Sequence, residues 1–431
     1  MRDDAGRTVL RGAARRYADE GHAARVHGLR ALGASGQPLV LPSPEDRLVW
    51  ALQRRLELGS PLADGERASV VFDAGHATWT VMIHGPRMQL LPGRVVGAHA
   101  TVRADAVTLA AVVEGVESGV DAFLDGRLTI RGNMGLVLQL EGVDSPERPV
   151  RFPRARTVRA LDLDTFYLEA GQGPPVVLLH GLGATGASML PTLAELSHDH
   201  RVLAPDLPGF GDSDKPVRAY DPEFYARWLV AFLDATGVAR ADVVGNSMGG
   251  RIAIEAGLVA PERVDHLVLY APSLAFKRFR EATPLVRLVA AEVAAMPMMA
   301  PRPLVMATLR MMFARPERLR DAWYEAAADE FVRVFATARG RMAVFSAARQ
   351  IYLEEAEGER GFWERLPALS RPALFLWGDR DQLVPYRFAP HVEAVLPQAR
   401  SIVLEYCGHV PQFEHPERTH RLVREFLGRP R

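Results

Sequence analysis

The amino-acid sequence predicts an α/β protein in which a doubly wound, mostly parallel sheet follows a smaller α+β domain. Two observations lead to this prediction. After about residue 157, short apolar runs of strand length alternate with helical stretches, a pattern typical of strands buried on both faces of a parallel sheet. Before that point, short β-branched and aromatic runs stand on either side of a helical stretch, which is the arrangement of an α+β domain.

Length and composition indicate an ordinary globular protein of two or three domains, with 431 residues and 48% hydrophobic residues. Lys plus Arg and Asp plus Glu both number 52, so the charge balance gives no reason to expect nucleic acid as a partner. Cys407 is the one cysteine, which excludes an intramolecular disulfide and a cysteine-based zinc site. We expect neither a metal nor a cofactor, and the oligomeric state stays open.

The N-terminal region, residues 1–40, is predicted as a helix or an arm. It lacks the apolar core of a secretory signal, and no stretch of the chain approaches 18 uninterrupted apolar residues, so we expect a cytoplasmic protein. The first 30 residues contain seven arginines and four acidic residues. A solvated helix is the favoured interpretation, and a basic helix that makes peripheral membrane contact is the alternative.

Residues 41–142 form the predicted α+β domain. Ser43 and Pro44 are typical of a helix start, and the spacing of the leucines that follow predicts a helix over Arg47–Leu58. A second helix is expected over Ala106–Val113. The expected strands are Val70–Asp73, Thr78–His84, His99–Arg103, Arg127–Arg131 and Gly135–Leu140. Residues 143–156, interrupted by three prolines, are predicted as a linker.

Residues 157–431 form the predicted sheet domain. Its expected strands are Val176–Leu179, Val202–Pro205, Val243–Val244, Val264–Tyr270, Ala373–Trp377 and Ile402–Leu404. A helical insertion over about 273–366 contains Met296, Met298, Met299, Met306, Met311 and Met312. These methionines indicate either core packing or a lid that adapts to an apolar substrate. The acidic segment Asp206–Asp214 lacks the ligand spacing of a calcium loop and is interpreted as a turn-rich crossover.

The first motif with chemical meaning is Gly245-Asn246-Ser247-Met248-Gly249, between an expected strand and an expected helix. In this context a G-x-S-x-G sequence predicts a tight turn that raises the serine hydroxyl above the sheet, beside a helix N-terminus that favours negative charge. Small neighbours are required because the turn leaves no room for side chains. Ser247 is therefore the candidate nucleophile.

The loop His180-Gly181-Leu182-Gly183 follows another expected strand. Serine hydrolases with such a nucleophile turn take one oxyanion donor from a loop in this position and one from the residue after the nucleophile. We expect the backbone N–H groups of Leu182 and Met248 to be these donors. His180 is interpreted as a structural residue that orients the loop.

Two further loops provide candidates for the acid and the base. Asp379 and Asp381 both follow the expected strand Ala373–Trp377, and a carboxylate there can reach a histidine of the next loop. His409 follows Gly408 after the last expected strand and is the candidate general base, with His415 as a second candidate. Cys407 is interpreted as a packing residue. The chain order of serine, aspartate and histidine, each beyond a strand end, supports a single site.

From about Arg159 to the end, the chain resembles the α/β-hydrolase superfamily. The resemblance is carried by VVLLHGLG (176–183), APDLPGFGDSDKP (204–216), VVGNSMGG (243–250), LWGDRDQLVP (376–385) and CGHVPQFEHPE (407–417). It implies an α/β-hydrolase sheet with a lid and a catalytic triad of Ser247, Asp381 and His409, because the acid of the family is the second aspartate of the fourth block. Asp379 is then a turn residue or an ion-pair partner of Arg380.

The blocks GNSMGG and CGH…FEHPE are also similar to those of carbon–carbon bond hydrolases that cleave aromatic ring-fission products. The chain departs from that group because His409-Val410-Pro411 lacks the tryptophan often found there. The loop after His180 also lacks the glycine-proline-rich form. A carboxylic ester hydrolase is therefore the first interpretation, and a carbon–carbon hydrolase is the alternative.

Residues from about 68 to 142 resemble a sterol carrier protein domain. The resemblance rests on Val71-Phe72-Asp73, on Ala104–Gly115 and on Ala122–Asn133, although Asn133 stands where an aspartate is common. It implies an apolar tunnel for fatty acyl or sterol ligands, and hence an apolar or lipid-like substrate for the hydrolase. A lipid-binding or transfer protein with an incidental hydrolase fold is the third interpretation.

Overall fold

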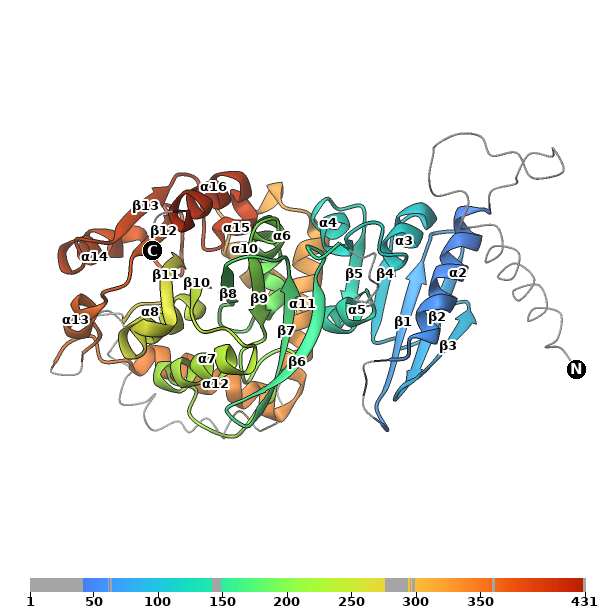
Figure 1. The fold of residues 1–431 in the computed structure, drawn as a ribbon, viewed down its shortest axis with the longest axis horizontal. Coiled ribbons are helices and arrows are strands. Elements are labelled where there is room, and N and C mark those ends of the chain that lie inside the picture. Colours follow the sequence, from blue (N-terminus) through green and yellow to red (C-terminus); the bar gives the residue numbers. More distant parts are fainter. Residues whose placement is uncertain are drawn as a thin grey trace, which may run out of the picture. The chain divides into compact units, whose positions relative to one another are not determined.

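The computed structural model describes residues 42–60, 62, 64–141, 149–275, 294, 296, 299–358 and 361–428. The chain divides into two compact units at Thr129 and Ile130, and each is described here by itself (Figure 1). The predicted N-terminal helix or arm lies outside the described residues. No helix in the described part of the chain is long and apolar enough to cross a membrane.

The smaller unit begins with helix α2 (Pro44–Glu57), and its start confirms the predicted cap. The Ser43 hydroxyl accepts the N–H of Asp46 at 3.1 Å, and the Asp46 carboxylate accepts the N–H of Ser43 at 3.3 Å. This reciprocal pair satisfies two N–H groups that the first helical turn leaves without partners. Pro44 occupies the first turn, where its missing N–H costs nothing.

A five-stranded sheet has the order β3–β2–β1–β4–β5, with β1 antiparallel to β2 and parallel to β4. The predicted helix Ala106–Val113 is confirmed as α3, and the short helix α4 (Gly119–Leu124), capped by Ser118, follows it. The strands are β1 (Arg67–Asp73), β2 (Thr78–His84), β3 (Arg87–Pro92), β4 (Ala100–Arg103) and β5 (Thr129–Gly132).

The strand predicted over Gly135–Leu140 is wrong, because these residues form helix α5 (Met134–Glu141). The Asn133 side chain accepts the N–H of Leu136 at 2.9 Å and so caps the helix. A short apolar run has no periodicity that distinguishes a strand from a buried helix. The capping asparagine was the local signal for the helix.

The larger unit contains an eight-stranded sheet with the order β6–β7–β9–β8–β10–β11–β12–β13. From β9 to β13 in this order, neighbouring strands are parallel, whereas β7 is antiparallel to both β6 and β9. The strands are β6 (Arg154–Ala160), β7 (Leu163–Ala170), β8 (Pro175–Leu179), β9 (Arg201–Pro205), β10 (Ala241–Asn246), β11 (Val264–Tyr270), β12 (Ala373–Gly378) and β13 (Arg400–Leu404).

All six strands predicted for this sheet are confirmed, but the hairpin of β6 and β7 is not predicted by the sequence. β6 begins within the segment 143–156 that was expected to be a linker, of which residues 143–148 lie outside the described residues. The hairpin turns at Leu161 and Asp162, with φ of 51° and 61°. Such a turn usually contains glycine or asparagine, so Leu-Asp gives little signal of it.

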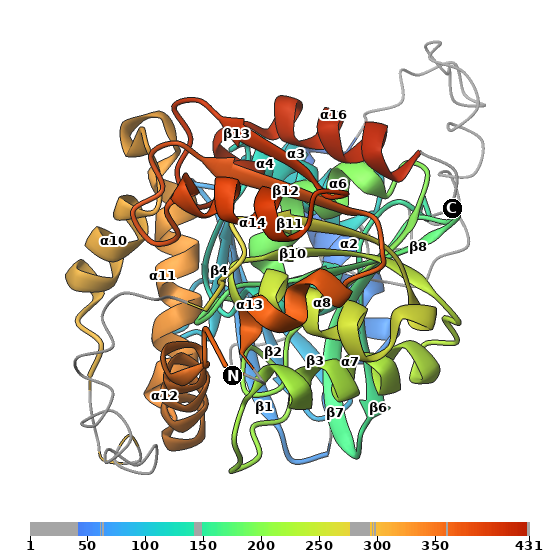
Figure 2. The same cartoon turned by 90° about the vertical axis from the view of Figure 1, so that its left-hand side faces the viewer.

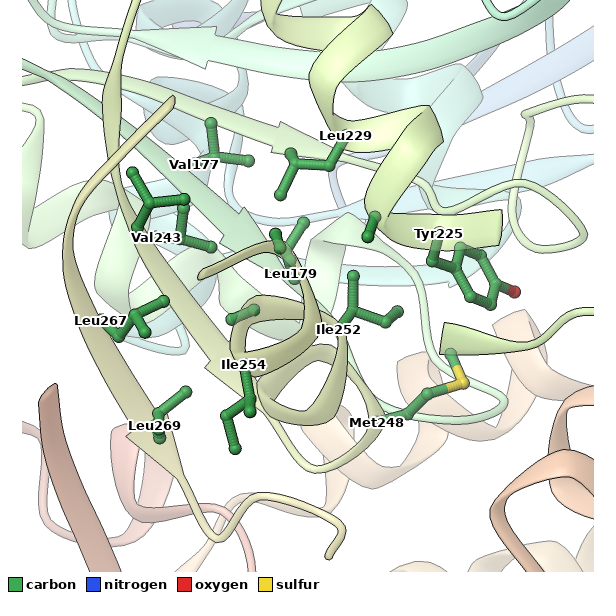
Figure 3. Close-up of a cluster of buried hydrophobic side chains, with 14 of the residues drawn as sticks. Val177, Leu179, Tyr225, Leu229, Val243, Met248, Ile252, Ile254, Leu267 and Leu269 are labelled. Carbon is green, nitrogen blue, oxygen red and sulfur yellow. The ribbon is translucent and has the colours of Figure 1, made fainter. Parts of the chain in front are cut away.

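Helices cover both faces of the large sheet (Figure 2). Helices α6 (Leu190–Leu196) and α16 (Pro416–Leu427) lie on one face, and α7 (Pro222–Ala235) and α8 (Met248–Val259) lie on the other. Figure 3 shows the core around α8, where Ile252 and Ile254 belong to one buried cluster with side chains of α7, β8, β10 and β11. Because this core is closely packed, it fixes the strand end from which α8 starts.

The insertion between β11 and β12 contains the helices α10 (Arg302–Met311), α11 (Asp321–Ala336), α12 (Ala338–Leu353) and α13 (Phe362–Arg365). Helices α10, α11 and α12 lie together beside the sheet, at the left of Figure 2. The chain then returns to β12 and continues through α14 (Ala389–Val395), β13 and α15 (Pro411–Glu414) to α16.

Candidate active site

Ser247 occupies the turn between β10 and α8 in a strained conformation, with φ of 54° and ψ of −115°. Its N–H donates to the carbonyl of Tyr270 at 2.9 Å. A side chain on Gly245 would overlap the backbone of Gly249, and one on Gly249 would overlap the carbonyl of Leu179. The motif therefore forms the sharp strand-to-helix turn that the sequence predicted, with the half-buried serine at its apex.

Asp381 and His409 form a buried hydrogen-bonded pair, with Asp381 Oδ2 at 2.7 Å from His409 Nδ1. The side chains are 0% and 5% exposed, respectively. Asp381 Oδ1 accepts the N–H groups of Leu383 at 2.8 Å and Val384 at 2.9 Å, which fixes the carboxylate. Asp379 instead accepts the N–H of Cys407 at 3.1 Å and lies 3.6 Å from Arg380 Nε.

The backbone of His409 lies beside the nucleophile turn. Its carbonyl accepts the amide of Asn246 at 3.1 Å, and the same amide donates to the carbonyl of Tyr270 at 3.0 Å. Among the described residues, no hydrogen bond joins Ser247 Oγ to His409 Nε2. Such bonds are often long before substrate binds. Sequence reasoning did not identify Asn246 as the residue that ties the histidine loop to β10.

The loop after β8 lies directly against the nucleophile. A Cβ on Gly181 would be 3.3 Å from Ser247 Cβ. Within the described part of the chain, the N–H groups of Leu182 and Met248 have no hydrogen-bond acceptor. Met248 opens α8, where the first N–H groups have no partner inside the helix. Both expected oxyanion donors are therefore available for a ligand.

His180 is buried and holds two loops together. Its Nε2 accepts the N–H of Leu207 at 2.9 Å, and its Nδ1 lies 2.8 Å from the carbonyl of Gly181. Burial lowers the pKa of His180 to about 4, so the imidazole is neutral at pH 7. A neutral ring that donates at Nδ1 and accepts at Nε2 fits the predicted role of orienting the loop.

Asp206 is a buried carboxyl group that the sequence did not single out. It accepts the N–H of Gly186 at 2.7 Å and the N–H of Asp212 at 2.8 Å. Burial, followed by the neighbouring Asp212 carboxylate, raises the pKa of Asp206 to about 7. The crossover after β9 is therefore ordered around this carboxyl group, and it is more than a turn-rich connection.

The remaining candidates near the histidine have structural contacts. Cys407 is buried, and burial raises the pKa of its thiol, so the thiolate is not available as a nucleophile at neutral pH. His415 Nε2 lies 2.9 Å from the carbonyl of Tyr406. Neither residue contacts the Asp381 carboxylate in the way that His409 does.

The methionines of the insertion are largely outside the core. Met296, Met299 and Met311 are 64%, 89% and 54% exposed, Met306 and Met312 are half-buried, and Met298 lies outside the described residues. Leu304, on the same helix as Met311, is 64% exposed. Of the two interpretations left open by the sequence, core packing therefore does not apply to Met296, Met299 and Met311.

Comparisons with known proteins identify both parts of the chain. Residues 174–416 match the model of the alpha/beta hydrolase fold family, and residues 62–143 match that of the SCP-2 sterol transfer family. The chain is 31% identical over 322 residues to the dihydrolipoyllysine-residue acetyltransferase component of the acetoin cleaving system of Pseudomonas putida. That match covers 74% of this chain and 79% of the relative.

Other relatives are hydrolases by name. The pimeloyl-(acyl-carrier protein) methyl ester esterase of Aeromonas hydrophila is 31% identical, over 60% of this chain and 97% of its own length. The 2-hydroxymuconate semialdehyde hydrolase of Pseudomonas sp. strain CF600 is 30% identical, over 63% of this chain and 93% of its own length.

Solved structures agree with the fold. A membrane phospholipase A described as a bacterial virulence factor shares 30% identity and a TM-score of 0.53, over 64% of this chain and 86% of that one. A thermophilic esterase from Thermogutta terrifontis shares 25% identity and a TM-score of 0.54, over 64% and 98% of the two chains. This chain therefore belongs to the α/β-hydrolase fold family and carries an SCP-2 sterol transfer family domain ahead of its hydrolase domain.

Proposed function

We propose that this protein is a serine hydrolase that cleaves carboxylic esters of apolar or lipid-like substrates through an acyl-enzyme. One observation carries the proposal. A serine with φ of 54° stands at a strand-to-helix turn, and the backbone of a histidine that is hydrogen bonded to a buried aspartate lies beside that turn. A strained serine at a strand-to-helix turn exposes its hydroxyl group, which is the position that a nucleophile needs.

The geometry supports the following proposed catalytic roles. Asp381 engages His409 Nδ1, which leaves Nε2 to take the proton of Ser247 as the serine oxygen attacks the ester carbonyl carbon. The N–H groups of Leu182 and Met248 hold the oxyanion of the tetrahedral intermediate. His409 then gives its proton to the leaving alcohol as the ester C–O bond breaks. Water, activated by His409, hydrolyses the acyl-enzyme and releases the carboxylic acid.

An apolar substrate is supported by the insertion and by the domain that precedes the hydrolase. Exposed Met299, Leu304 and Met311 provide flexible apolar side chains on the insertion, and thioether side chains adapt to varied apolar shapes. The SCP-2 sterol transfer family model covers residues 62–143. Relatives named as a methyl ester esterase and a phospholipase A agree with ester chemistry.

A carbon–carbon bond hydrolase is the second candidate. Relatives named as 2-hydroxymuconate semialdehyde hydrolases are 30% identical, close to the 31% of the esterase. The ester is placed first because Val410 and Pro411 follow His409 without the tryptophan that ring-fission hydrolases often have there.

The test is a series of p-nitrophenyl esters from acetyl to palmitoyl, assayed on the wild type, Ser247→Ala and Ser197→Ala. Ser197 is a buried serine of the same unit whose hydroxyl donates to the carbonyl of Ala194, so it serves as the control. We expect Ser247→Ala alone to lose activity, and medium or long acyl chains to have the higher kcat/KM. Turnover of a dienoic ring-fission product without ester turnover would favour the second candidate. Lipid binding without phosphonate labelling of Ser247 would favour the third interpretation, a lipid-binding or transfer protein whose hydrolase fold is incidental.

A further inference from the structure

The loop that carries His409 is bound to the insertion as well as to the sheet. The N–H of His409 donates to the carbonyl of Met312 at 2.6 Å. A Cβ on Gly408 would lie 2.8 Å from the Cα of Phe313, so the two backbones touch and glycine is the residue that fits. The segment 312–315, directly after α10, therefore lies on the backbone of the histidine loop.

Glu414 joins the same two segments through one carboxylate. Its Oε2 accepts the N–H of Gly408 at 2.6 Å, and its Oε1 accepts the N–H of Arg315 at 2.8 Å. One N–H belongs to the residue before the candidate base, and the other belongs to the insertion. An ionised carboxylate has two acceptor oxygens and no donor, so its side chain can accept both of these N–H groups. Hydrogen bonds to a charged acceptor are also stronger than hydrogen bonds between neutral groups.

Side-chain contacts extend this joint on both sides. The Arg315 guanidinium lies over the ring of Tyr406, 4.6 Å from its centroid. The rings of Trp323 and Phe413 meet edge to face, with centroids 5.3 Å apart. The insertion and the residues 406–414 thus share backbone, carboxylate and aromatic contacts, and Glu414 lies at the centre of the polar ones.

The backbone of His409 is consequently fixed by two elements. Asn246, next to the nucleophile, binds its carbonyl, and Met312, in the insertion, binds its N–H. Proton transfer from Ser247 depends on the distance and angle of the imidazole, and a misplacement of about 1 Å can cost on the order of a hundredfold in rate. A shift of the segment 312–315 would therefore move the backbone of His409, the proposed base.

We infer that Glu414 is a positioning residue, which couples the insertion to His409 by holding the N–H groups of Gly408 and Arg315 on one carboxylate. The inference rests on the proposed role of His409 as the base. It predicts that Glu414 acts on the chemical step and leaves substrate binding largely unchanged. It also predicts that the two segments loosen together when the carboxylate is removed.

The experiment compares Glu414→Gln, Glu414→Ala and the control Glu417→Gln, an exposed glutamate three residues further on. We expect kcat to fall on the order of tenfold in Glu414→Gln, whose single amide oxygen retains one of the two N–H groups. In Glu414→Ala the fall should be on the order of a hundredfold, with KM within about threefold of the wild type. The rate of phosphonate labelling of Ser247 should fall in parallel, and Glu417→Gln should match the wild type.

Amide hydrogen exchange of the same variants gives a readout that does not need turnover. We expect faster exchange in Glu414→Ala at residues 406–410 and 312–316 together, with the central strands β8 and β10 unchanged. Unchanged kcat in both variants, a rise in KM alone, or a uniform rise of exchange over the whole unit would overturn the inference. If the wild type neither turns over esters nor is labelled, the proposed function fails, and exchange at the two segments still decides whether Glu414 couples them.

Discussion

Asp381 and His409 are joined by a 2.7 Å hydrogen bond, whereas Asp379, two residues before Asp381, accepts the N–H of Cys407. Both aspartates follow β12, and residue spacing alone does not separate them. The structure separates them because Asp381 is completely buried against the imidazole and Asp379 binds the turn backbone.

The first prediction uses these two aspartates as a matched pair. Asp381→Asn should lower kcat about ten-thousandfold, because the amide favours the wrong tautomer of His409 and does not stabilise the imidazolium. Asp379→Asn keeps an acceptor for the N–H of Cys407 and should change kcat less than about tenfold. Steady-state ester hydrolysis measures both. A larger loss of kcat in Asp379→Asn than in Asp381→Asn would mean that Asp381 is not the catalytic acid.

The second prediction concerns the tight packing of the nucleophile turn. Gly249→Ala should destabilise the larger unit by about 1–3 kcal/mol and lower ester hydrolysis, because the new methyl group overlaps the Leu179 carbonyl and lies 2.8 Å from that of His180. Gly257→Ala, on the same helix, is the control. Its methyl group would lie 2.7 Å from the end of the Leu369 side chain, which can move. Chemical denaturation and kcat are measured for both, and equal effects would contradict the idea that the turn is the constrained position.

The third prediction concerns the pH dependence of stability. The pKa of His180 is lowered to about 4 in the folded state from an ordinary value of 6.5. Between these values the unfolded chain binds more protons, so His180 destabilises the fold as the pH falls from 6.5 to 4. The cost of His180→Asn should therefore be about 2–3 kcal/mol smaller at pH 4.5 than at pH 7.

Hydrogen exchange of β8 and β10 amides at the two pH values measures this difference. The exposed His198 lies in the same unit, and His198→Asn serves as the control for replacing a histidine there. A cost of His180→Asn that does not depend on pH would mean that burial does not lower the pKa of this histidine.

The fourth prediction concerns a buried ion-pair network one turn after Ser247. Arg251 binds Glu255 at 2.8 Å and also Glu354, just beyond the end of α12, and the side chains of Arg251 and Glu255 are 2% and 3% exposed. Arg251→Met should destabilise the larger unit by about 3–5 kcal/mol, because it leaves buried carboxylates without that partner.

Arg227→Ala is the comparison for this network. Arg227 pairs with Glu223 at 2.8 Å, and both side chains are more than half exposed, so its removal should cost less than about 1 kcal/mol. Chemical denaturation of the two variants gives the comparison. Similar costs for both would show that the buried network adds no more than a surface pair does.

The sequence by itself determined six of the eight strands of the larger sheet and predicted the residues of the candidate site. Apolar runs such as Val176–Leu179 and Ala373–Trp377 predicted buried parallel strands because strands covered on both faces are rich in apolar residues. The motif around Ser247 predicted a tight turn because only small neighbours fit there. In contrast, the apolar run of α5 was predicted as a strand, and the β6–β7 hairpin was missed, because each depends on a local cap or turn that periodicity does not register.

Only the tertiary structure decided which polar groups share a contact. Asp206 and Gly186 are 20 residues apart, Arg315 and Glu414 are 99 apart, and Asn246 and His409 are 163 apart. A hydrogen bond depends on distance and direction in space, and the spacing of these residues along the chain gives neither. The sequence therefore predicted the chemical groups of the candidate site, and the packing of the insertion and the sheet decided how they are held.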